Sequence, residues 1–101
     1  MSEANAFLLI HATPNPENMD LLPEYLSSMG PVFDKYQGVV VSKFKVIEQL
    51  VGRGQTKMVA ILSFLNAEVI RILIAGDEFK ELAKLRARVF LKLDLLLSEL
   101  M

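Results

Sequence analysis

The apolar residues of this chain change their spacing in a fixed order, and that order constrains the fold more than any single residue does. Residues 6–12 form a short apolar run that ends in a proline-rich stop, as expected of a buried strand. Over residues 17–36 the apolar positions recur at spacings of three and four, which indicates a helix with one buried face. Residues 39–50 and 57–64 are rich in Val, Ile and Phe and flank a glycine turn, which predicts a hairpin of two strands.

The second half of the chain repeats this order. Asn66 can cap a second helix, Gly76 breaks it, and a shorter helix then continues to Arg86 or Arg88. Residues 89–98 are ambiguous, because leucines alternate with polar residues as in a strand, while leucine is also a good helix former. We predict a strand, because the order β-α-β-β-α-β then consists of two halves of about 45 residues, each closing a right-handed crossover.

This order is typical of an α+β fold, the ferredoxin-like sandwich, in which a four-stranded antiparallel sheet carries two helices on one face. We expect one domain over residues 1–101, with residues 1–5 disordered. The other face of the sheet would be exposed in a monomer. Because 52% of the residues are hydrophobic and the mean hydropathy is +0.38, we expect a homodimer that packs sheet against sheet, a dimeric α+β barrel.

Local signals add four expectations about the first half of the chain. Pro23 fits a helix only in its first turn, and Pro31 after Gly30 should bend the helix midway. The pair Gln37-Gly38 should end it with a C-terminal glycine. The strand that follows is expected to be long and to reach Leu50, with one face drier than the other.

Composition excludes several classes of function. Without Cys there is no disulfide, thiolate nucleophile, zinc ribbon or iron–sulfur site, and a single His leaves no two-histidine metal site, so we expect no metal and no cofactor. A net charge of −1 argues against nucleic acid, and residues 57–61 lack the aromatic platform of RNA-recognition modules. No apolar stretch approaches the roughly 18 residues of a membrane span, and no signal peptide is evident. We therefore expect a cytoplasmic protein that contacts no membrane.

Short motifs lie in one register from Ala6 to the end of the chain. They are Asn15-Pro16-Glu17, Glu24-Tyr25 followed by Pro31 and Gly38, Leu50-Val51-Gly52, Phe64 with Glu68, and Glu78-Phe79 leading to Leu85-Arg86. None of these motifs is specific alone. Together they resemble a small bacterial family of unknown function in the dimeric α+β-barrel superfamily, whose relatives include antibiotic-biosynthesis monooxygenases and muconolactone isomerases.

The chain departs from that family's pattern at three places. Residues 73–77 replace an aromatic-and-asparagine segment, Lys43-Phe44 replaces a glycine pair, and Val51 replaces an acidic residue. Polar groups near the family's cleft have thus been lost, so we expect a more apolar ligand than those of relatives. The altered aromatic segment and the absence of Trp argue against the haem chemistry of some relatives.

The resemblance implies a homodimer that binds a small apolar or aromatic metabolite in a cleft between sheet and helices. The alternative is a cofactor-independent enzyme, like the monooxygenases or isomerases, that acts on a small aromatic or quinonoid compound. Whether the protein is an enzyme is left open. A third interpretation, a purely structural interaction module, would need an exposed apolar patch beyond the dimer contact.

Three of the candidate ligand-binding residues lie on the first strand: Phe7, Leu9 and His11. If Phe7 and Leu9 face the helices, His11 points into the cleft and could act as a general base or hydrogen-bond a phenolic oxygen. The simpler interpretation is a partly solvated histidine at the end of a strand, without a role in catalysis.

The other candidates are Tyr25, Phe64 and Arg86. At the position the resemblance favours most, the Arg86 guanidinium could clamp a carboxylate or enolate, or it could pair with a nearby acid, and Arg88 competes for the same role. Tyr25 could donate a hydrogen bond to a ligand in the cleft, or lie in the core with its hydroxyl at the edge. His11, Tyr25 and Arg86 are thus the candidates for catalysis, should any occur.

Overall fold

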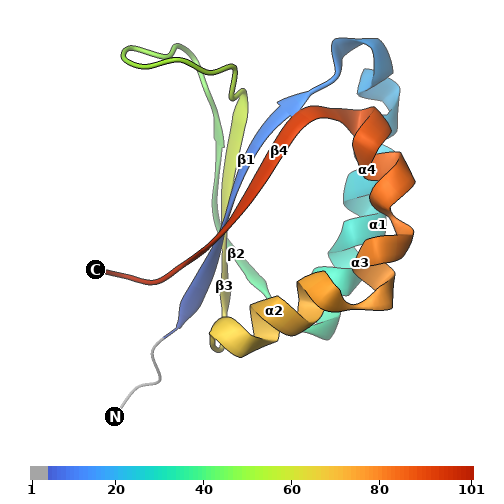
Figure 1. Ribbon diagram of the computed structural model, residues 1–101, viewed down its shortest axis with the longest axis vertical. Coiled ribbons are helices and arrows are strands. Elements are labelled where there is room, and N and C mark those ends of the chain that lie inside the picture. Colours follow the sequence, from blue (N-terminus) through green and yellow to red (C-terminus); the bar gives the residue numbers. More distant parts are fainter. Residues whose placement is uncertain (1–4) are drawn as a thin grey trace.

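A computed structural model describes residues 5–101 and shows a four-stranded antiparallel sheet with all of its helices on one side (Figure 1). The elements are β1 (Ala6–Pro14), the 3₁₀ helix η1 (Pro16–Leu21), α1 (Leu22–Lys35), β2 (Val39–Lys45), β3 (Met58–Phe64), α2 (Ala67–Ala75), α3 (Asp77–Glu81), α4 (Ala83–Val89) and β4 (Phe90–Ser98). The strand order is β2-β3-β1-β4, so the predicted ferredoxin-like fold is confirmed. The predicted disorder of residues 1–5 lies outside the described residues, apart from Asn5, which is exposed.

The ambiguous last segment is a strand, as predicted. Helix α4 ends at Val89, Phe90 already has extended backbone angles, and β4 pairs with β1 from Phe7 opposite Ser98 to Pro14 opposite Phe90. Strand β1 is paired with β3 on its other side, so without β4 it would be an unpaired edge. Pairing with β1 therefore outweighs the helix preference of the leucines.

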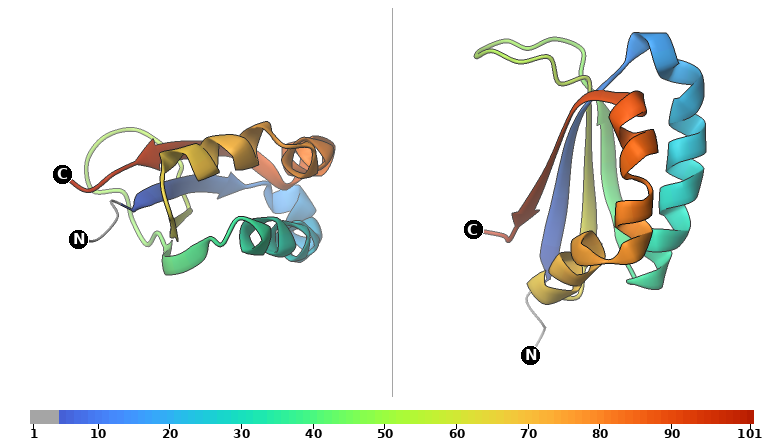
Figure 2. Two further views of the ribbon diagram at one scale, coloured as in Figure 1. Left: turned by 90° about the horizontal axis from the view of Figure 1, so that it is seen from below. Right: turned by 45° about the vertical axis from the view of Figure 1, so that its right-hand side comes forward.

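The two faces of the sheet differ in what covers them. On β1, Ala6, Leu8 and Ala12 are buried against the helices, together with Leu62 and Phe64 of β3. We call this side the covered face. The alternate residues of β1, which begin at Phe7, point to the opposite side, where Figure 2 shows no helix. We call that side the open face.

The first predicted helix consists of two segments. Asn15 accepts a hydrogen bond from the Glu17 amide and begins η1, after which Pro23 lies in the first turn of α1, as predicted. Helix α1 then continues unbroken through Pro31 to Lys35. A side chain at the residue before a proline disfavours helical backbone, and Gly30 has none, which helps the helix to pass this point.

The end of α1 differs from the expectation of a glycine cap. The residue with left-handed backbone is Gln37, with φ of 61°, and not Gly38. Gly38 is required for space instead, because a Cβ atom there would lie 2.6 Å from two ring atoms of Phe64. Its amide donates to the Phe33 carbonyl at 2.8 Å, which closes the helix end.

The prediction that the second strand reaches Leu50 is wrong. Strand β2 ends at Lys45, and residues 46–57 form an extended arm that projects from the sheet (Figure 1). Strand β1 has no register partner on β3 beyond Met58, so a longer hairpin would have only two strands, which are marginal alone.

Within the described residues, no helix is long and apolar enough to cross a membrane.

The second helix begins and ends where the sequence predicts. The Asn66 side chain accepts a hydrogen bond from the Val69 amide, and α2 stops before Gly76. The shorter helix that follows is divided in two, α3 and α4, with Leu82 between them. This division places α4 against η1 and α1, next to the start of the sheet's last strand (Figure 1).

Candidate functional site

A groove of about 410 Å³ lies between the covered face and the helices. All four strands and helices α1, α2 and α3 contribute to its walls, which are formed mainly by aliphatic and aromatic side chains. Small residues on both sides, Ala12 and Ala60 on the sheet and Gly30 on α1, leave room between the two layers. Only two side chains in the lining carry a strongly polar group, the Tyr25 hydroxyl and the Lys43 ammonium.

Tyr25, which lines this groove, is in direct contact with Arg86. The guanidinium Nε of Arg86 donates to the Tyr25 hydroxyl at 2.9 Å, and a terminal nitrogen donates to the Phe79 carbonyl at 2.7 Å. The guanidinium also lies 3.7 Å from the centre of the Phe79 ring. Phe90 packs edge-on against Tyr25 with ring centres 5.4 Å apart. These contacts hold the phenol and the guanidinium in one orientation.

The hydrogen bond from Arg86 determines what Tyr25 can do. Arginine has only donors, so the Tyr25 oxygen must accept, and the phenolic proton stays free to be donated. Within residues 5–101, the Tyr25 hydroxyl makes no hydrogen bond to a protein acceptor. Tyr25 is only 6% exposed and lines the groove, so its proton could be donated to an acceptor atom in the groove.

Of the six candidate ligand-binding residues, only Tyr25 lines the groove, and Arg86 is connected to the groove through its hydrogen bond to Tyr25. Phe64 is fully buried in the core, where it contacts Phe33 edge-on, and it does not line the groove. Arg88 is exposed, and its carbonyl accepts a hydrogen bond from Asn18, so it does not share the position of Arg86.

Phe7, Leu9 and His11 lie on the open face, on the opposite side of the sheet from Tyr25. His11 is paired with Val59 on one side and Asp94 on the other. His11 was expected to enter the cleft only if Phe7 and Leu9 faced the helices. They face the opposite side, so His11 does not enter the cleft. Burial of Leu8 fixes this outcome, because strand residues alternate between faces.

Among the groove residues that the sequence analysis did not name as site candidates are Phe79 and Lys43. Phe79 precedes Arg86 by seven residues, a spacing that places both on one face of a helix, and this signal could have identified it. Lys43 could not be assigned so easily, because the register of β2 shifts between Val40 and Ser42. Beyond that shift, Lys43 lies opposite Ala60 on the covered face rather than beside Val39 on the open one.

The open face and the arm are also rich in apolar side chains. Val39, Phe44 and Leu96 are roughly half exposed there, and Phe7, Leu9, Val59 and Ile61 are partly exposed. On the arm, Ile47 is 97% exposed, Leu50 82% and Val51 89%. Apolar surfaces of this extent are typical of protein interaction sites.

Charged groups at the surface join the helices on their outer side. Lys35 at the end of α1 donates to the Glu78 carboxylate on α3, and this hydrogen bond lowers the pKa of Glu78 and raises the pKa of Lys35. In the part of the chain that the structure describes, no group of three His, Cys, Asp or Glu side chains could hold a metal ion.

Comparison with known proteins identifies the family. The model of the family described as "Domain of unknown function (DUF1330)" matches residues 5–99, so the chain belongs to that family, and the resemblance inferred from the sequence is confirmed. The comparison with curated proteins gives no match.

Solved structures share the fold over almost the whole chain. A protein of unknown function from Rhodopseudomonas palustris has a TM-score of 0.80 at 18% identity, covering 98% of this chain and 84% of that one. A dabb family protein with a ferredoxin-like fold from Mesorhizobium loti has a TM-score of 0.70 at 8% identity, with 98% and 99% covered. A proposed antibiotic biosynthesis monooxygenase from Nitrosomonas europaea has a TM-score of 0.70 at 5% identity, with 100% and 94% covered. At these identities the likeness establishes the fold alone.

Proposed function

We propose that this member of the DUF1330 family is a homodimer that binds a small apolar or aromatic metabolite in the groove of each subunit. One observation carries the proposal: a mainly apolar groove of about 410 Å³ contains a fixed hydroxyl whose proton is free. Its volume lies within the usual range of ligand pockets, roughly 300–1,000 Å³. A few directed polar groups in an apolar cavity are the usual arrangement for orienting a ligand.

Affinity and orientation come from different parts of this groove. Burial of the ligand's apolar surface against groups such as Met29, Phe79 and Leu95 contributes about 25 cal/mol per Å². The Tyr25 hydroxyl selects a ligand with a carbonyl, phenolic or quinone oxygen at one end. A ligand without that oxygen would leave the hydroxyl unpaired in an apolar environment, which costs about 1–3 kcal/mol.

The homodimer is supported by the open face. Its partly exposed apolar residues form a layer that a second copy could cover with the same residues, as a two-fold axis requires. In such a pair the grooves stay accessible, because each one lies on the side of the sheet away from the partner.

A cofactor-independent monooxygenase or isomerase is the second candidate, and the contact between Arg86 and Tyr25 favours it. A guanidinium that donates to the phenol strengthens the phenol as a donor, so the pair would stabilise negative charge developing on a ligand oxygen. If Tyr25→Phe abolished turnover but still bound the apolar part of the ligand, the result would support the enzyme.

Calorimetric titration with 1,4-naphthoquinone and with naphthalene tests the proposed binding site. Ala60→Phe fills the groove from β3 and is expected to weaken both compounds at least tenfold, whereas Ile61→Phe, its neighbour on the open face, should not. Tyr25→Phe is expected to weaken the quinone about two- to tenfold and to strengthen naphthalene, which then leaves no hydroxyl unpaired in the groove. Equal affinities for Ala60→Phe and the wild-type protein would contradict binding in the groove.

A further inference from the structure

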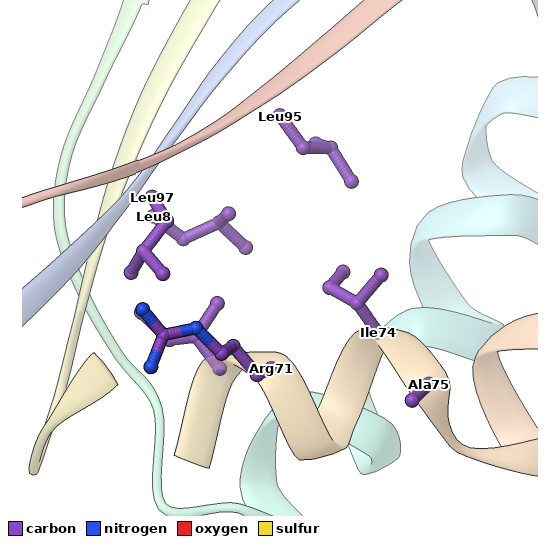
Figure 3. A pocket seen from close by; sticks show the side chains of 7 residues that line it. Leu8, Arg71, Ile74, Ala75, Leu95 and Leu97 are labelled. Carbon is purple, nitrogen blue, oxygen red and sulfur yellow. The ribbon is translucent and has the colours of Figure 1, made fainter. Parts of the chain in front are cut away.

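A second cavity, of about 310 Å³, lies between α2 and β4 (Figure 3). Ile70, Ile74 and Ala75 of α2 form one wall, and Leu95 and Leu97 of β4 form the other. The one charged side chain in its lining is Arg71.

This cavity adjoins the groove that holds Tyr25. Leu8, Ile74 and Leu95 line both, and Figure 3 shows the side chains of Ile74 and Leu95 pointing into the space between α2 and β4. Along β4 the linings extend from Phe90 in the groove to Leu97 in the second cavity, a rise of about 23 Å. The apolar space therefore suits an elongated molecule better than a single ring.

The charges around this space are of one sign. Lys43 is the one charged residue in the lining of the groove, and Arg71 is the one charged residue in the lining of the second cavity. None of the acidic residues among positions 5–101 lines either cavity, although the chain as a whole carries a net charge of −1. An apolar space bordered only by cations favours anionic molecules over cationic ones.

Arg71 has donors available for such an anion. Arg71, Ile74 and Ala75 are spaced so that they share one face of α2, and Figure 3 shows the guanidinium extending toward the sheet beside Leu8. Its ion pair with Glu68 is 3.5 Å long, and both side chains are largely exposed to solvent, so the pair contributes little to stability. Arg86, in contrast, already donates to Tyr25 and to the Phe79 carbonyl.

We infer that the ligand of the groove is an amphipathic anion: its apolar body lies along the groove, and its carboxylate or similar anionic group binds the Arg71 guanidinium at the opening between α2 and β4. This inference rests on the proposed function and adds the chemical class of the ligand. Arginine suits the role because its planar donors match a carboxylate in a bidentate contact.

Calorimetric titration with decanoate and decan-1-ol at pH 7, which share one chain and differ in the anionic group, tests the inference. The wild-type protein is expected to bind decanoate more tightly. Arg71→Gln should weaken decanoate about three- to tenfold and leave decan-1-ol unchanged. Arg88→Gln is the matched control, since it removes the same charge from an exposed residue of α4 that lines neither cavity, and it should change neither affinity.

The outcomes separate this inference from the function on which it rests. If neither compound binds the wild-type protein, the proposed apolar site itself is contradicted. If decan-1-ol binds and decanoate is not preferred, only the anionic class is contradicted. A loss of decanoate affinity in Lys43→Gln but not in Arg71→Gln would contradict the assignment of the anionic group to Arg71.

Discussion

The covered face and the open face of the sheet are built from neighbouring residues of the same strands, yet they differ in what they meet. Leu8 is 2% exposed beneath the helices, while Leu9 beside it is partly exposed on the open face. In most half-buried sheets the outward residues are polar. Here outward positions such as Phe7 and Ile61 are apolar as well. The helices therefore cover only one of the two apolar faces, and the other face is the one on which we propose that a second copy packs.

The largest expected effect comes from truncating the core of the covered face. Phe64→Ala removes a fully buried ring and is expected to lower the free energy of unfolding by about 3–5 kcal/mol. The measurement is urea denaturation at two protein concentrations differing by a factor of one hundred. The loss should be the same at both, because Phe64 stabilises the subunit itself.

The matching variant on the open face is Ile61→Lys, three residues away on the same strand. It is expected to abolish the proposed dimer in sedimentation equilibrium while the circular dichroism spectrum of the fold is kept, because Ile61 lies on the open face and not in the core beneath the helices. A dimer that persists in Ile61→Lys would place the subunit contact elsewhere.

A smaller effect on the covered face is expected from Gly38→Ala. The added Cβ would lie 2.6 Å from the Phe64 ring, which has no room to move in the core, so we expect a loss of about 1–3 kcal/mol. Thermal unfolding measures it. Gly38→Ala in a Phe64→Leu background should cost less, and equal costs in the two backgrounds would contradict the steric account.

The layer of helices contributes through its caps. Asn66→Ala removes the side chain that accepts from the Val69 amide, and we expect a loss of about 1 kcal/mol in urea denaturation. Asn66→Asp keeps an acceptor at the same place and serves as the control. A similar loss in both variants would show that the cap contributes nothing specific.

The smallest effect is expected at the exposed outer side of the helices. Because Lys35 lowers the pKa of Glu78, the pair stabilises the fold above the carboxyl's ordinary pKa of 4.5, and this contribution is lost as the pH falls through the lowered value. Because the pKa of Lys35 is raised from 10.5, the contribution is also lost as the pH rises through that raised value.

Glu78→Gln should therefore be slightly less stable than the wild-type protein at neutral pH and equal to it in strong acid. Urea midpoints measured across this range, with and without 1 M NaCl, test the pair. A difference that is independent of both pH and salt would have to come from packing instead of charge.

The order of elements could be predicted from the sequence, because each one has a clear local signal. The stop after β1, the Asn66 cap and the alternating leucines of β4 are all contained in short segments. The arm could not be predicted, since the Val- and Ile-rich residues beyond Lys45 look like a strand until the length of β1 is known.

Half of the candidate site was misplaced for one physical reason. Both alternate sets of β1 are apolar, so the period of two cannot decide whether Leu8 or Leu9 faces the helices. The contact between Tyr25 and Arg86 joins residues 61 positions apart, and only the packing of α1 against α4 brings them together. Family resemblance named both residues, but their hydrogen bond is a property of the folded chain.

A methyl NMR titration of the wild-type protein with decanoate tests whether the ligand binds on the covered face of the sheet and not on the open face. Leu95 and Leu96 are adjacent on β4, and Leu95 lines both cavities while Leu96 lies on the open face. If the ligand lies in the groove and the second cavity, the methyl groups of Leu95 and Ile74 should show shifts that saturate with binding, and those of Leu96 and Leu9 should show none. Saturable shifts at Leu96 and Leu9, with Leu95 unchanged, would place the ligand on the open face and contradict binding between the sheet and the helices.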